Sequence, residues 1–256
     1  MLFAQFDSAK GRAILAEKLD LFRDVIAKLE DIYDVRPFNQ QSAQSLLELW
    51  MLATALRPRT IFELGAGSRS STLALALAAA DIQGCTVQSL DIAPSDFAFL
   101  TRTHFPRLRF GPVVDTSADA SAFALPDTWP RPILMLYDAH DGDLPGNIIS
   151  HHAIQSWFPK LAGQTIAVHD CSVRQRDDGI TYPPPHVKAI HWSERAIIGY
   201  AEVAPLVAWM NRERVDFWRP GDALESLGLP GADSSLIALT VPAASSPAFS
   251  PAHPNA

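Results

Sequence analysis

The sequence of 256 residues predicts an α/β fold, in which helices cover both faces of a mostly parallel sheet. Short apolar segments alternate with segments of helical periodicity between residues 60 and 168, which is typical of strands joined by crossover helices. Each of the five apolar segments also ends at a carboxylate or within a few residues of one. Because ligands of open parallel sheets bind beyond the carboxyl ends of the strands, this pattern indicates a binding site there.

Two helices are expected before the first strand. Apolar residues from Leu15 to Tyr33 recur at spacings of four and three, which predicts a helix over residues 9–33. This apolar stripe either packs on the protein's own core or forms a homodimer contact. A second helix is expected from Ser42 to Leu56, since Pro58 ends it. Residues 1–40 are interpreted as an N-terminal helical addition to a main domain over residues 41–241.

The main domain is expected to follow the α/β alternation and then to change character. Strands are predicted at residues 60–64, 86–91, 108–114, 133–137 and 165–168, and helices at 70–80, 94–104 and 147–158. Residues 171–194 are predicted to be a long polar loop, either a lid or a wall of an acceptor pocket. A helix over 194–211, strands at 215–218 and 236–241, and a disordered tail over 242–256 complete the prediction.

Composition excludes several classes of function. A formal net charge of -7 gives no broad basic surface for nucleic acid. The two cysteines provide neither a disulfide framework nor a zinc cluster. The first residues do not resemble a signal peptide, and no apolar run has the length of a membrane helix, so we expect a cytoplasmic protein without membrane contact.

The segment Glu63-Leu64-Gly65-Ala66-Gly67-Ser68 joins a predicted strand to a predicted helix, an arrangement that places a ligand on a helix N-terminus. Glu63 would repel a pyrophosphate but would attract a ligand with a cationic end. A dinucleotide motif would need glycine at position 70, where this chain has Ser70. Asp91, at the end of the second predicted strand, has the chemistry to accept hydrogen bonds from both hydroxyls of a ribose. Together these residues favour a nucleoside with a cationic end over a dinucleotide.

These residues, together with Asp138-Ala139-His140 and His169-Asp170, resemble the class I S-adenosylmethionine-dependent methyltransferases over roughly residues 40–172. The resemblance is to the branch with small-molecule and sugar O-methyltransferases and cephalosporin hydroxylase-like proteins. It implies a Rossmann-like, doubly wound sheet of seven strands. It also implies a set of cofactor-binding residues. They are Glu63, Gly65, Gly67, Ser70, Ser71, Asp91, Asp115 and Asp138.

The resemblance also implies the residues on the acceptor side. Asp138 and Asp170 end neighbouring predicted strands, where they would share one Mg²⁺, although Cys171 stands where catechol-type enzymes carry an amide. His140 and His169 are the candidate bases, because histidine titrates near neutral pH, and Asp138 is assigned to the same catalytic set. The alternative for each histidine is a structural hydrogen bond at a strand end.

The function expected from these residues is transfer of a methyl group to a hydroxyl of a small molecule, with or without a metal ion. One alternative is a non-catalytic nucleoside-binding or assembly protein on the same fold. Another is a metal-dependent enzyme like the hydroxylase-named relatives.

Overall fold

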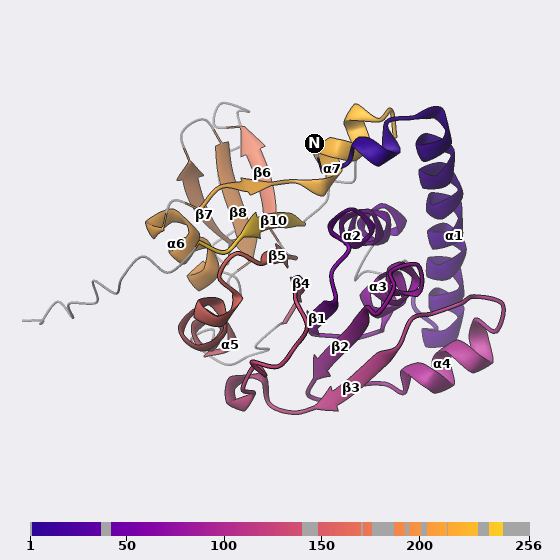
Figure 1. The fold of residues 1–256 in the computed structure, drawn as a ribbon, viewed down its shortest axis with the longest axis horizontal. Helices are drawn as coiled ribbons and strands as arrows, with labels where there is room; N and C mark the ends of the chain where they lie inside the picture. The colour runs from indigo at the N-terminus through magenta and orange to yellow at the C-terminus, as the bar shows by residue number, and fades with distance from the viewer. Residues whose placement is uncertain are drawn as a thin grey trace, which may run out of the picture.

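A computed structural model describes most of the chain. The described residues are 2–36, 42–139, 148–169, 171–175, 187–192, 195–200, 204–213, 215–229 and 236–242. They form a seven-stranded sheet, a second sheet of three strands, and helices on both faces of the larger sheet (Figure 1). None of the helices in this part of the chain is long and apolar enough to span a bilayer.

The larger sheet has the strand order β3-β2-β1-β4-β5-β10-β9. Its first five strands in the chain are parallel, and β10 and β9 are added antiparallel at the β5 edge. The strands are β1 (Thr60–Leu64), β2 (Thr86–Asp91), β3 (Val113–Ser117), β4 (Ile133–Tyr137), β5 (Thr165–Val168), β9 (Phe217–Trp218) and β10 (Ile237–Thr240). Every residue of β1 and β4 is buried, as expected for central strands covered on both faces. The predicted α/β fold with a mostly parallel seven-stranded sheet is confirmed.

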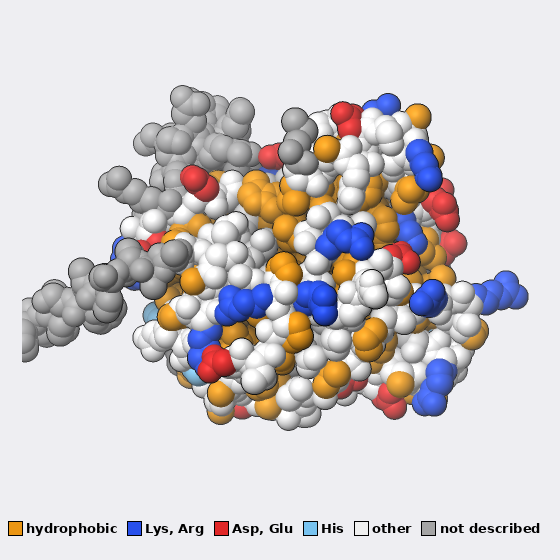
Figure 2. All heavy atoms as spheres, in the orientation of Figure 1, with side chains coloured by type: hydrophobic (Ala, Val, Ile, Leu, Met, Phe, Trp, Pro, Cys, Tyr) orange, Lys and Arg blue, Asp and Glu red, His pale blue; other side chains and the backbone are white. Residues whose placement is uncertain are grey.

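The helices divide between the two faces of this sheet. On one face, α1 (Ala9–Tyr33) runs along the outside of α2 (Ala43–Leu56) and α3 (Ser70–Ala80), as Figure 1 shows. The shorter helices are α4 (Phe97–His104), α5 (Ile148–His152), α6 (Ala204–Arg212) and α7 (Pro220–Ser226). Single turns of other helix types lie at Ala4–Phe6, Ala120–Ala122, Ala153–Trp157 and Phe158–Leu161. On the face of the molecule in Figure 2, lysine and arginine side chains are scattered among hydrophobic and acidic ones.

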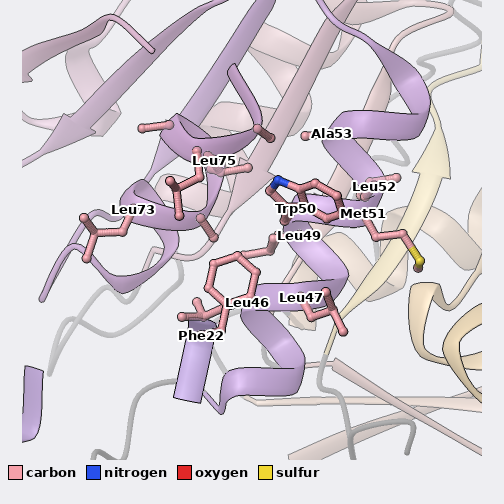
Figure 3. Close-up of a cluster of buried hydrophobic side chains, with 14 of the residues drawn as sticks. Phe22, Leu46, Leu47, Leu49, Trp50, Met51, Leu52, Ala53, Leu73 and Leu75 are labelled. Carbon is pink, nitrogen blue, oxygen red and sulfur yellow. The ribbon is translucent and has the colours of Figure 1, made fainter. Parts of the chain in front are cut away.

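The apolar stripe of α1 packs inside the protein. Leu15, Phe22 and Leu29 are fully buried and belong to the core that α2 and α3 also form. Figure 3 shows Phe22 among the leucines of those two helices. The first of the two interpretations is therefore confirmed, and these buried side chains are not available to a partner. A homodimer through the N-terminal helix stays a prediction.

The region after β5 is the largest departure from the predicted elements. Residues 171–194 are not one loop, because β6 (Cys171–Gln175) and β7 (Val187–Trp192) pair with β8 (Arg195–Tyr200) in an antiparallel sheet. The helix predicted over 194–211 is therefore wrong at Arg195–Tyr200, and among the described residues of this range the helix is Ala204–Arg212. β8 pairs with β7, which directly precedes it, and with β6, which lies well before it in the chain, so its strand state depends on both pairings.

The third strand also begins later than predicted. The backbone N–H of Gly111 donates to the carbonyl of Ala76 in α3, and that of Leu108 donates to Phe105. Residues 108–111 therefore form a connecting segment that is bonded to α3, and the pairing of β3 with β2 starts at Val113. Helix α7 has no counterpart among the predicted elements.

Candidate functional site

The glycine turn after β1 lies directly against the end of β4. Gly65 has φ 86° and Gly67 has φ 42°, backbone conformations that favour glycine. A Cβ on Gly65 would lie 2.0 Å from the carbonyl oxygen of Asp138. The N–H of Asp138 in turn donates to the carbonyl of Leu64 at 2.9 Å. The two strand ends predicted to carry the donor and acceptor sides are thus in contact.

Asp91 closes the outer side of this turn. Its Oδ2 accepts hydrogen bonds from the N–H groups of Ala66 at 2.8 Å and Gly67 at 2.9 Å, while Oδ1 accepts from Ala93 at 3.0 Å. Partial burial raises the pKa of Asp91, but these hydrogen bonds and the charge of Arg69 outweigh it, so the pKa lies below its usual value. An ionised carboxylate therefore faces the glycine turn. The predicted contact of Asp91 with ribose hydroxyls stays a prediction.

Glu63 lies beneath the turn and is fully buried. Its Oε1 accepts from the Ser71 hydroxyl, and its Oε2 accepts from the hydroxyls of Thr72 and Ser89, each at 2.7 Å. Burial raises the pKa of Glu63 above its ordinary value, and the three hydroxyls oppose that rise. Both carboxylate oxygens of Glu63 therefore accept hydrogen bonds inside the fold, so this side chain supports the glycine turn from its buried side. Ser70, at the start of α3, is also nearly buried, with 3% of its surface exposed.

Arg69 is a buried residue of the turn that the sequence analysis missed. It has φ 69° and its side chain is 0% exposed. Its Nη1 donates to the Ser89 hydroxyl at 2.9 Å and lies 2.9 Å from Oδ1 of Asp115, and its Nε donates to the Ser95 carbonyl at 3.0 Å. Asp115 is therefore ion-paired, which places it in a contact that the resemblance did not imply. The sequence did contain a signal for this residue. An arginine follows the glycine turn, and each of the next two strands carries an aspartate with which it could pair.

Asp138 and His169, which were both predicted for the acceptor side, lie next to each other. The Nδ1 of His169 lies 2.9 Å from Oδ1 of Asp138, and both side chains are mostly buried. They meet because β4 and β5 are parallel neighbours, with Tyr137 opposite Val168. The structure therefore brings these two predicted residues together.

Two other residues predicted for this side, His140 and Asp170, lie outside the described residues. In the part of the chain that is described, no group of three or more His, Cys, Asp or Glu side chains is arranged to hold a metal ion. The predicted pair of metal ligands, Asp138 and Asp170, therefore stays a prediction.

Comparison with known proteins gives structural neighbours but no family. No protein-family model matches the chain. No curated protein matches it either.

Three of the solved structures that it resembles are cofactor-bound or methyltransferase structures. The cofactor-bound protein Rv0187 from MTB is 16% identical, with a TM-score of 0.47, over 88% of this chain and 90% of that one. The O-methyltransferase TomG from Streptomyces achromogenes, in complex with SAM, is 15% identical, with a TM-score of 0.41, over 86% and 88%. A methyltransferase from Geobacter sulfurreducens is 15% identical, with a TM-score of 0.40, over 69% and 87%. At such low TM-scores and identities, the ligand and reaction proposed for this chain rest on its own residues.

Proposed function

We propose that the protein is an S-adenosylmethionine-dependent methyltransferase that acts on a hydroxyl of a small molecule. The observation that carries this proposal is the contact between the glycine turn and Asp138, which is paired with His169. A nucleoside bound at the turn would lie next to a histidine–carboxylate pair. Direct transfer of a methyl group needs this proximity, because most of the rate comes from alignment of donor and acceptor.

The donor side fits S-adenosylmethionine in shape. Gly67 is exposed, has no side chain and lies at positive φ, so a ligand has room to approach the backbone of the turn at this residue. Ile92, directly after Asp91, is 75% exposed and offers an apolar surface to a purine ring. When bound, S-adenosylmethionine supplies the activated methyl group.

The donor side also fits in charge. Asp91 and Asp115 lie beside a single guanidinium, that of Arg69. The excess of carboxylates favours a ligand with a sulfonium and an ammonium group and disfavours a pyrophosphate. We propose that Glu63 contributes by fixing the start of α3 through Ser71 and Thr72, because its carboxylate is covered by these residues. Asp91 would exchange its bonds with the turn for bonds to the ribose.

On the acceptor side, we propose His169 as the base. The Nδ1 of His169 lies 2.9 Å from Oδ1 of Asp138. A proton on Nδ1, facing this carboxylate, would leave the lone pair of the imidazole on Nε2, the form that takes a proton from a hydroxyl. Asp138 would thus orient His169 and stabilise its protonated form, as carboxylates do beside catalytic histidines. His140 is proposed as a second group on the acceptor. A Mg²⁺ ion held by Asp138 and Asp170 is the alternative means of favouring the deprotonated hydroxyl.

Calorimetry with S-adenosylhomocysteine tests the donor side. The wild-type protein should bind this product, and Asp91→Ala should weaken binding at least about tenfold, because a charged hydrogen-bonding partner is lost. Asp24→Ala is the matched control, since Asp24 is an exposed aspartate of α1 and should leave the affinity unchanged. Absence of binding at millimolar product would refute the proposal.

Turnover across a panel of hydroxyl compounds tests the acceptor side. His169→Gln should keep the affinity for S-adenosylhomocysteine and lose methyl transfer, because glutamine has no group that titrates near neutral pH. If the wild-type protein binds the product but methylates none of the compounds, the result favours the non-catalytic nucleoside-binding alternative.

A further inference from the structure

Arg69 connects four segments of the chain beneath the candidate donor site. Its backbone ends the glycine turn and caps α3. Its guanidinium reaches Ser89 in β2, Asp115 in β3 and the carbonyl of Ser95 in the segment after β2. The donors on Nε, Nη1 and Nη2 therefore all have partners within the fold.

This arrangement has an energetic cost that a purely structural position would avoid. A residue with a Cβ at φ 69° is strained by roughly 1 kcal/mol, and a fully buried guanidinium has lost its hydration. Lysine has one ammonium group and lacks the planar set of donors that reaches several acceptors at once. An arginine held here at such a cost indicates that the geometry of the segments it joins is important.

We propose that Arg69 is a positioning residue for the nucleoside half of the ligand, which it serves by holding residues 92–96 against the glycine turn. The inference rests on the proposed function. Residues 92–96 follow Asp91 directly and begin with the exposed Ile92, so their position sets where a ribose and a purine would lie.

Two sets of bonds join the turn to this segment. The outer set runs from Asp91 to the N–H groups of Ala66 and Gly67, at the surface that a ligand would approach. The inner set runs from Arg69 to Ser95 and is buried. A ribose that binds Asp91 competes with the outer set. The N–H of Gly65 still donates to the carbonyl of Leu90 before Asp91. The inner set then holds residues 92–96 themselves against the turn, so the affinity for a nucleoside depends on it.

Three variants test this inference by calorimetry with S-adenosylhomocysteine and with 5′-methylthioadenosine, a thioether that contains only the nucleoside half. Arg69→Met should weaken both affinities by the same factor, about tenfold or more, because a buried charged partner is lost. Asp115→Asn keeps a neutral acceptor for Arg69 and should weaken both by a smaller factor. Leu75→Ala is the control, because Leu75 is buried in α3 away from the turn and should lower Tm without changing either affinity.

The inference would be overturned if Arg69→Met bound both probes with the same affinities as the wild-type protein. An equal loss of affinity in Leu75→Ala would also overturn it, since the effect would then follow stability alone. If Arg69→Met does not fold, Asp115→Asn decides by the same criteria.

If the wild-type protein binds neither probe, the proposed function fails, and hydrogen exchange of the ligand-free protein then tests the positioning role separately. Backbone amides of residues 93–96 should exchange faster in Asp115→Asn than in the wild-type protein. Unchanged exchange would overturn the inference.

Discussion

Glu63→Gln tests the buried network beneath the glycine turn through its pH dependence. The substitution keeps the oxygen that accepts from Ser71, but it places an NH₂ group where the carboxylate accepts from Thr72 and Ser89. The Thr72 hydroxyl is able to turn and accept. Ser89 already accepts from Arg69, so its own O–H loses its acceptor. We expect a loss of about 2 kcal/mol in the free energy of unfolding, the value of a hydrogen bond to a charged group.

The sign of the pH dependence follows from the raised pKa of Glu63. The folded protein holds a proton on this carboxyl more tightly than the unfolded chain, whose ordinary pKa is 4.5. The resulting stability is fully present below that unfolded value and is lost as the pH rises through the folded pKa. The stability difference between the wild-type protein and Glu63→Gln should therefore be larger at about pH 5 than at about pH 8.

Urea unfolding of both proteins at the two pH values measures this difference. Asp119→Asn is the control. Hydrogen bonds from the Ser121 hydroxyl and N–H lower the pKa of Asp119. Its contribution is present above the unfolded pKa of 3.8 and is lost only as the pH falls through the folded value, so its difference should be constant over the same range. A Glu63→Gln difference that stays constant, or that grows with pH, would refute the reasoning.

Three further predictions concern the turn, a helix end and the acceptor side. Gly65→Ala should cost more than about 3 kcal/mol in urea unfolding, because a positive φ is combined with a methyl group 2.0 Å from the carbonyl oxygen of Asp138. Gly163→Ala, at φ 75° with nothing near its Cβ, should cost only about 1 kcal/mol, and equal costs would contradict the close contact. Arg57→Gly should raise the free energy of unfolding by about 1 kcal/mol, because Arg57 ends α2 at φ 48°, and a lower denaturation midpoint would argue against this. EDTA should leave methyl transfer unchanged if His169 is the base, whereas a loss restored by Mg²⁺ would support the metal site.

The regular elements were predictable where the signal is local. The helix Ala9–Tyr33 and the strand Ile133–Tyr137 have the predicted bounds. Their apolar periodicity and flanking residues are contained in a short stretch of chain, so one sequence is enough to locate them. The pairing of Asp138 with His169 was predictable for a similar reason, because both residues end neighbouring strands of a parallel sheet.

The departures occur where distant segments decide the structure. Arg195–Tyr200 was predicted as helix, but it is a strand because it pairs with the adjacent β7 and also with β6, which lies well before it in the chain. Arg69 was passed over because Ser95 and Asp115, which hold its guanidinium, lie well beyond it in the chain. The assignment of Glu63 to a ligand stays a prediction, but its burial under hydroxyls from α3 and β2 was not visible in the sequence.

The sequence by itself therefore determined the alternation of strands and helices. It thereby also determined the edge of the sheet along which Asp91, Asp138 and His169 lie. Chain order and periodicity are enough for this, because parallel strands end at a common edge. Only the tertiary structure decided which carboxylates face outward and which are bound inside. That choice depends on burial and on hydrogen-bond partners brought together by the packing of α3 on β2 and by the pairing of β2 with β3. Asp91 contacts the glycine turn from its solvent-facing side, whereas Glu63 and Arg69 are buried beneath the turn.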